Sequence, residues 1–174
     1  MPATTKGRDM SQEPQIQARD AQHYAAIPMT VTMQSLAGAV DEGFPELFRW
    51  LGSQGIAPAG PPFIRYLVVD MEASLQLELG VPVAAPMPES GRIRPGTLPP
   101  GRYAVLRHVG PYDGLIDANA ALQQWARERG LEFDMTETPE GSAWGARLEE
   151  YITDPSGEPD PSKWETDVAY LLRG

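Results

Sequence analysis

The sequence has 174 residues, which is enough for one ordinary domain or for two small repeats that share a core. Its net charge of −10 at pH 7 would repel nucleic-acid phosphates and anionic membrane surfaces, so neither is an expected partner. The absence of cysteine excludes disulfides, thiolate catalysis and cysteine-ligated metals, and two distant histidines, His23 and His108, exclude a three-histidine site. No apolar run has the length of a signal peptide or a membrane span, and we therefore expect a cytoplasmic protein without metal or cofactor.

The first half begins with a polar stretch, residues 1–15, that lacks periodicity and predicts a flexible leader outside the fold. Beyond it the pattern predicts a short strand, an interrupted strand, a helix and a hairpin of two strands, at residues 16–19, 24–33, 44–51, 63–70 and 74–83. Pro28 interrupts the second strand and makes it an edge or bulged strand. Pro45 is tolerable only in the first turn of a helix, which places the helix start near Phe44.

The second half restarts the same order of elements. Residues 84–100 are dense in proline and glycine and predict a linker with one short strand. A strand, a helix and two further strands follow, at residues 102–108, 113–129, 142–153 and 164–172. Tyr24 and Trp50 of the first half correspond to Tyr103 and Trp125, and each tryptophan lies five residues before a glycine.

This repetition predicts an α+β fold, namely a duplicated βαββ domain with pseudo-twofold symmetry and antiparallel sheets. Repeat one spans about residues 16–83, the linker 84–100 and repeat two 101–174. We expect the helices to cover one side of the sheets and a ligand crevice to lie on the other. Trp50 and Trp125 recur at equivalent helical positions, which favours core packing for both.

The strand predicted at residues 142–153 has two different faces. One face is apolar and should pack on a core: Ala146, Leu148 and Ile152. The opposite face carries Arg147, Glu149 and Tyr151. A carboxyl group beside a phenol in mid-strand belongs either to a solvated face or to the floor of a polar pocket in an apolar surround.

Four short segments carry a resemblance to a known family: residues 99–104, 108–112, 149–155 and 164–166. In this order and spacing they resemble the GyrI-like small-molecule-binding domain, which also supplies effector-binding halves to AraC-type and MerR-type transcription regulators. The resemblance runs from about residue 15 to the C-terminus. It implies a duplicated βαββ fold that binds a bulky, hydrophobic and often cationic molecule between the repeats. Because only a short polar stretch precedes residue 16, we expect a stand-alone member without a helix-turn-helix region.

The resemblance also implies a buried glutamate two positions before a tyrosine on the repeat-two strand. This residue maps to Glu149, and Glu150 remains an alternative because the doubled acid leaves the register open by one. Strand alternation puts Glu149 on the face of Tyr151, which agrees with the mapped role. Aligning Tyr66 with Tyr151 puts Ile64 at the place of Glu149 in repeat one.

The candidate ligand-binding residues are an acidic anchor, Glu149, and aromatic walls from both halves: Tyr151, Tyr112, Tyr66, Phe63, Trp144 and Trp164. A carboxylate in an aromatic-lined cavity requires a cation, a donor or a proton, so it favours a positive or hydrogen-bonding ligand. Arg147 lies on the same strand face and would neutralise this anchor if the two formed an ion pair. The sequence leaves that question open.

The first hypothesis for function is binding of a hydrophobic or cationic small molecule, for sensing or sequestration. The second is a hydrolase of cyclopropane-bearing or similar xenobiotic compounds, as the resemblance implies for some members, with Glu149 and Tyr151 as the catalytic residues. The third is an interaction module that inhibits a larger enzyme, as the family name implies for gyrase. The sequence gives no indication of the oligomeric state.

Overall fold

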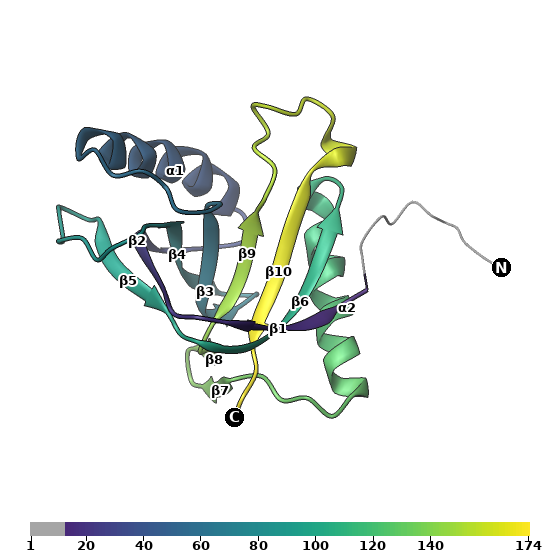
Figure 1. Ribbon diagram of the computed structural model, residues 1–174. Helices are drawn as coiled ribbons and strands as arrows, with labels where there is room; N and C mark the ends of the chain where they lie inside the picture. Colours follow the sequence, from purple (N-terminus) through teal and green to yellow (C-terminus); the bar gives the residue numbers. More distant parts are fainter. Residues whose placement is uncertain (1–12) are drawn as a thin grey trace.

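The computed structural model describes residues 13–174, and Figure 1 shows the arrangement of the elements. In chain order they are β1 (Gln15–Arg19), β2 (Gln22–Val31), α1 (Leu36–Ser53), β3 (Phe63–Asp70), β4 (Ser74–Pro82), β5 (Arg94–Leu98), β6 (Gly101–Val109), η2 (Tyr112–Gly114), α2 (Leu115–Glu128), β7 (Met135–Thr138), β8 (Gly141–Trp144), β9 (Arg147–Tyr151), η3 (Pro161–Lys163) and β10 (Glu165–Leu171). Residues 1–12 of the predicted leader lie outside the described part, and β1 already begins at Gln15.

A single antiparallel sheet organises the molecule. Its strands follow the order β1-β6-β10-β9-β3-β4-β2-β5, and the hairpin β7-β8 joins this sheet where β8 pairs with β3. The strands β3 and β9 therefore lie at the centre, between the positions of α1 and α2 (Figure 1). The structure confirms the predicted α+β fold with antiparallel strands.

Both helices pack on the same side of the sheet, which we call the helix face. Leu47 and Leu51 of α1 form a core cluster with residues of β2 and β4. Leu115 and Leu122 of α2 form a second cluster with residues of β6 and β10. Each helix is amphipathic, and its apolar stripe packs on the sheet. This packing buries apolar surface that would otherwise contact water. Neither helix within residues 13–174 has the length and apolar character needed to span a membrane.

The opposite side of the sheet, which we call the concave face, has a core of its own. Phe63, Tyr103 and Leu148 belong to one buried cluster on this side, together with residues of β2, β5 and β10. These residues come from the central strands β3 and β9 and from strands as far apart in the order as β6 and β5, so the sheet curls around them. Strand alternation explains the arrangement, since Leu148 and Glu149 must point to opposite faces.

The two predicted repeats are present as β2-α1-β3-β4 and β6-α2-β9-β10, and the hairpin β7-β8 is inserted into the second. The strands that precede the two repeats, β1 and β5, lie at the two edges of the sheet, and each pairs with the other repeat. The strand β1 pairs with β6 of repeat two, and β5 pairs with β2 of repeat one. At the centre, Ile64 of β3 lies directly opposite Glu149 of β9, and these are the two residues that the repeat alignment makes equivalent. The pseudo-twofold axis therefore passes between them.

The helix of repeat one is longer than predicted and starts eight residues before Phe44. Pro45 lies inside α1 and is exposed to solvent, so water can satisfy the carbonyl that its missing N–H leaves without a partner. Pro28 lies in β2 beyond the residues that β5 pairs, which agrees with its predicted edge position.

The predicted strand at residues 142–153 is divided into β8 and β9. The break falls at Gly145 and Ala146, where the side chain of Asp134 occupies the space that a Cβ atom of Gly145 would need. Ala146 and Leu148 pack on a core as expected. Ile152 lies just beyond the end of β9 and is exposed, so its predicted core position was wrong.

Glycine at position 80 is required by close packing on the concave face. A Cβ atom at Gly80 would lie 2.5 Å from Cζ of the Phe63 ring, and both residues are held by the pairing of β3 with β4. We expect Gly80→Ala to lower the free energy of unfolding by about 1–3 kcal/mol in urea titrations, because the added methyl group overpacks a buried core.

Gly38→Ala is the matched control for this substitution. Gly38 is exposed in α1 and has no atom within 4 Å of a built Cβ, so the same chemical change should be stabilising there by roughly 0.5–1 kcal/mol. Equal effects of the two substitutions would contradict the packing described for Phe63.

Candidate functional site

The candidate site is built around Glu149, at the centre of the sheet. Glu149 lies opposite Ile64 on one side and Val168 on the other, and its side chain is 8% exposed. Ile64 and Val168 belong to the cores under α1 and α2, so Glu149 points to the helix face. Glu149 thus lies on the side that the helices cover, whereas the ligand crevice was expected on the other side. Alternation was predicted correctly, but alternation alone does not tell which face the helices cover.

Three neutral groups donate hydrogen bonds to the carboxyl group. The hydroxyl of Tyr66 donates to Oε1 at 3.1 Å, and the hydroxyl of Tyr151 donates to the same oxygen at 2.9 Å. Nδ2 of Asn119 donates to Oε2 at 3.1 Å. These bonds compensate the loss of water around a buried acidic group without adding a positive charge.

Asn119 is itself fixed by its surroundings on α2. Its Nδ2 also donates to the carbonyl oxygen of Leu115 at 2.8 Å, and its Oδ1 accepts from the hydroxyl of Tyr170 at 2.6 Å. Nε2 of Gln123 donates to the same hydroxyl oxygen at 2.8 Å. The chain of bonds from Gln123 to Glu149 therefore couples two positions of α2 with β10 and β9, and it holds the amide in one orientation.

The two phenols that bind Glu149 are kept in their neutral form. Burial raises the pKa of Tyr66 and of Tyr151 well above the usual value, and the nearby charge of Glu149 raises both further. Both hydroxyls therefore remain proton donors at neutral pH.

Aromatic rings cover this polar group from the solvent side. Tyr151 contacts Tyr112 at a ring-centroid distance of 5.5 Å and Phe44 of α1 at 6.3 Å. Tyr112 also lies over Trp164 at 4.8 Å. Tyr112 is 37% exposed and Phe48, one helical turn after Phe44, is 39% exposed. The rim between α1 and η2 is thus the apolar, partly open side of the site.

Arg147 does not neutralise Glu149 by direct contact. Within residues 13–174, Arg147 forms no ion pair, and its guanidinium instead lies among three rings. The distances from Cζ to the ring centroids are 5.7 Å for Tyr66, 4.8 Å for Trp144 and 5.1 Å for Tyr170. The question that the sequence left open is answered by these contacts with aromatic rings.

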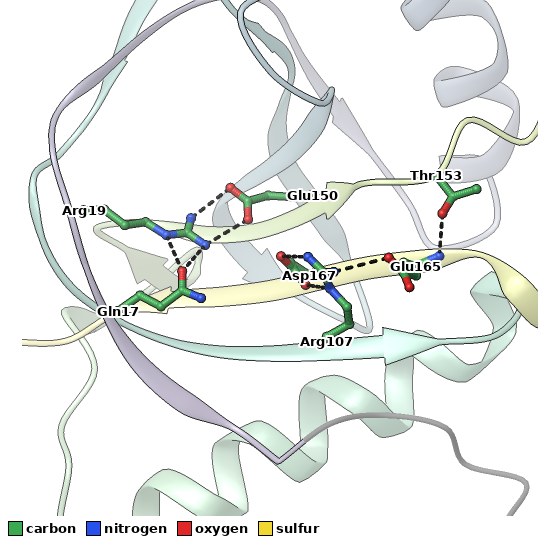
Figure 2. Close-up of polar contacts among 7 residues, drawn as sticks. All are labelled: Gln17, Arg19, Arg107, Glu150, Thr153, Glu165 and Asp167. Atoms are coloured by element: carbon green, nitrogen blue, oxygen red, sulfur yellow. Dashed lines mark hydrogen bonds and ion pairs between the residues drawn. The ribbon is translucent and has the colours of Figure 1, made fainter.

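The neighbouring acid, Glu150, belongs to the concave face. Figure 2 shows Arg19 reaching from β1 to Glu150 on β9, with nitrogen–oxygen distances of 2.9 and 3.1 Å. Arg107 makes a similar two-bond contact with Asp167 at 2.7 and 2.9 Å. Glu150 and Asp167 thus each have a guanidinium partner on the concave face. The ambiguity between the two acids is settled by the hydrogen bond of Tyr151, which goes to Glu149 and not to Glu150.

One predicted wall residue lies away from the site. Phe63 is 1% exposed in the concave-face core and contacts Tyr24 at 5.1 Å. Since Phe63 pairs with Glu150, its side chain points away from Glu149, and its assignment as a pocket wall is corrected. The other predicted residues lie on the helix face at different distances from Glu149. Tyr66 and Tyr151 bind Glu149, and Trp144 lies beside Arg147. Tyr112 contacts the ring of Tyr151, and Trp164 contacts Tyr112.

Three residues of this site were not predicted from the sequence: Phe44, Asn119 and Tyr170. Asn119 lies four residues after Leu115 and three before Leu122, so it is a polar residue on the apolar stripe of α2. An amide in such a stripe needs a buried polar partner, and this signal could have identified it. Phe44 and Tyr170 carry no comparable signal, because aromatic residues in a helix and a strand are ordinary core residues.

The comparison with protein-family models matches residues 12–170 to the GyrI-like small molecule binding domain. The chain belongs to this family. The resemblance carried by the four sequence motifs is thereby confirmed, and this GyrI-like domain is a small-molecule-binding domain by family. A comparison with curated proteins finds no match.

Several solved structures share the fold of this GyrI-like domain at low sequence identity. The EcmrR C-terminal domain superposes with a TM-score of 0.74 at 17% identity, covering 94% of this chain and 98% of that chain. EcmrR in its cryo-EM complex with DNA superposes with a TM-score of 0.76 at 18% identity. The match covers 97% of this chain but only 60% of the EcmrR chain. SAV2435 bound to tetraphenylphosphonium gives 0.59 at 11% identity, covering 94% of this chain and 95% of that chain.

A hydrolase from Listeria innocua is a further structural relative, with a TM-score of 0.58 at 14% identity and 92% coverage of both chains. Identities this low establish a shared fold and carry no residue roles with them. The site described above therefore rests on its own geometry.

Tyrosine ionisation should limit stability at high pH. Burial is the largest cause of a raised pKa for each of the six tyrosines: Tyr24, Tyr66, Tyr103, Tyr112, Tyr151 and Tyr170. Unfolded tyrosines ionise near pH 10, whereas the folded ones stay protonated. The folded state thus binds more protons, and its free energy of unfolding should fall as pH rises above about 10.

Urea unfolding at a series of pH values from about 8 to 11 measures this slope, and ultraviolet absorbance reports phenolate formation. In Tyr151→Phe the slope should be smaller, because one ionising group is removed. Phenolate absorbance that rises near pH 10 while the fold stays intact would contradict the burial described for these rings.

Proposed function

We propose that this domain binds a bulky hydrophobic molecule that carries positive charge, on the helix face between α1 and α2, with Glu149 as its polar anchor. The observation that carries this proposal is the environment of Glu149. Its three hydrogen-bond partners, Tyr66, Tyr151 and Asn119, are all neutral donors, which suit a carboxylate and leave its negative charge uncancelled. A cation that replaces water near such a group gains more than it would at an exposed acid.

The rings over Glu149 supply the hydrophobic part of the proposed site. Tyr112, Tyr151, Trp164 and Phe44 present faces and edges on which an aromatic or cationic group can stack. Tyr112 and Phe48 are already partly exposed, so the ligand would enter between η2 and α1. The ligand would take the place of ring–ring contacts that now cover Tyr151.

Tetraphenylphosphonium is a suitable probe, because it is a bulky aromatic cation and the structural relative SAV2435 has been solved with it bound. We expect saturable binding in isothermal titration calorimetry. Glu149→Gln should weaken the affinity roughly tenfold or more, since interactions with a charged group contribute about 1.5–3 kcal/mol.

Glu150→Gln provides the control, because it makes the same change one residue away on the concave face. It should leave the affinity within about twofold of the original, even though it removes the partner of Arg19. Equal losses in both variants, or no binding of the cation by the original protein, would count against Glu149 as the anchor.

A hydrolase is a second candidate, and one observation favours it. The hydroxyl of Tyr151 donates to Oε1 of Glu149 at 2.9 Å, which places a proton donor beside a carboxyl group that can position or activate water. In this reaction Glu149 would take a proton from water as the water oxygen bonds to a strained electrophilic carbon and a ring bond of that carbon breaks. Tyr151 would protonate the departing atom, and Glu149 would then return its proton to the Tyr151 phenolate. The structural relative described as a hydrolase has the same fold and supplies no further detail.

Product analysis with a cyclopropane-bearing electrophile tests this second function. We expect ring-opened product with the original protein, and a loss of at least about a hundredfold in rate for Tyr151→Phe while binding persists. Tyr112→Phe serves as the control, because Tyr112 contacts Tyr151 through its ring. Intact compound after prolonged incubation would eliminate the reaction for that substrate.

A further inference from the structure

Arg147 has a positive charge without a partner. It lies two residues before Glu149 on β9 and faces the same side of the sheet. Within residues 13–174 its side chain makes no hydrogen bond and no ion pair, and its Nε is fully buried without an acceptor. Arg19 and Arg107 of the same sheet behave differently, since each binds a carboxylate through two nitrogens. Arg65 of β3 also has a buried Nε without an acceptor, but its other nitrogens bind the hydroxyl of Tyr24 and the carbonyl oxygen of Gly145.

Three aromatic rings hold the guanidinium in place. Tyr66, Trp144 and Tyr170 surround Cζ at 4.8–5.7 Å, which gives favourable cation–π contacts. Ring faces do not satisfy the N–H groups of a guanidinium, which has five donors in a planar fork. The rings therefore fix the position of Arg147, and its N–H groups have no acceptor within residues 13–174.

Tyr66 keeps this charge apart from Glu149. Its hydroxyl is bound to Oε1 of Glu149, and its ring is one of the three beside Arg147. Both oxygens of Glu149 already accept bonds from Tyr66, Tyr151 and Asn119. The fold thus presents an acidic and a basic group on one face, separated by roughly 7 Å along the strand, with aromatic rings between and around them.

We propose that Arg147 binds an oxyanion of the ligand, a carboxylate, sulfonate or phosphate, so that the molecule bound on the helix face is an aromatic zwitterion. This proposal rests on the function proposed above and adds the second charged group. The ligand places its cationic end near Glu149, its aromatic body against the rings, and its oxyanion on the planar fork of Arg147, which matches two oxygens at once.

Two dyes with the same ring system isolate the oxyanion. Rhodamine 110 is a zwitterion with a free carboxylate, and rhodamine 123 is its methyl ester and carries only positive charge. In fluorescence anisotropy titrations we expect the original protein to bind rhodamine 110 about tenfold more tightly than rhodamine 123, because only the former offers Arg147 a negatively charged acceptor with two equivalent oxygens. Arg147→Gln should abolish this preference and bind rhodamine 123 as well as the original protein, or better.

Arg129→Gln is the matched control, because Arg129 also lies over a tryptophan ring, that of Trp125, but at the far end of α2. It should keep the preference for rhodamine 110. Arg147→Lys retains the charge without the planar fork, so we expect a reduced but measurable preference in this second variant.

Equal affinity of the original protein for the two dyes would overturn the oxyanion site. This comparison uses the original protein alone, so it does not depend on whether a variant folds. A preference that survives in Arg147→Gln would overturn it as well. In either case binding of rhodamine 123 or tetraphenylphosphonium leaves the proposed function standing. Failure of the original protein to bind either dye or tetraphenylphosphonium overturns both proposals.

Discussion

The buried carboxyl group of Glu149 is the constraint on which the arrangement of the helix face depends. An acidic group at the centre of a sheet is stable only if donors replace the water that it loses. Repeat one supplies Tyr66, the strand of Glu149 supplies Tyr151, and α2 supplies Asn119. Because these donors come from both repeats, neither half of the domain can form the site alone. The tyrosines that donate to Glu149 also cover it from solvent with their rings. The same side chains therefore stabilise the charge and determine the shape of the site.

Duplication with one difference explains why a single acid occupies this place. Ile64 and Glu149 are equivalent by repeat and lie opposite each other at the pseudo-twofold axis. A perfect repeat with glutamate in both halves would place two like charges on directly paired positions, where they repel. Isoleucine instead packs under α1 with Tyr66. The symmetric scaffold therefore holds an asymmetric site, and the asymmetry follows from electrostatics at the axis.

Much of this organisation could be predicted from the sequence. The repeat pattern gave the order of elements, and alternation placed Glu149 with Tyr151 and apart from Leu148. Phe63 was misplaced because the face of a strand residue depends on its register with a partner strand, which a single sequence does not contain. Asn119 was missed because apolar neighbours on α2 were counted and the amide among them was not. The separation of Arg147 from Glu149 depends on ring positions that only the assembled fold defines.

The crossing of the edge strands β1 and β5 to the other repeat has a consequence for how the domain forms. The pairs β1-β6 and β2-β5 join segments that are distant in the sequence, because the strand that precedes each repeat pairs with the first strand of the other repeat. A half cut at the linker would expose unpaired backbone groups on two strands, and a second copy of itself would be the nearest source of partners. Pairings of such long range lose the entropy of closing large loops before their stabilising contacts form, so folding should be slow. We also expect the domain to fold as one cooperative unit instead of repeat by repeat.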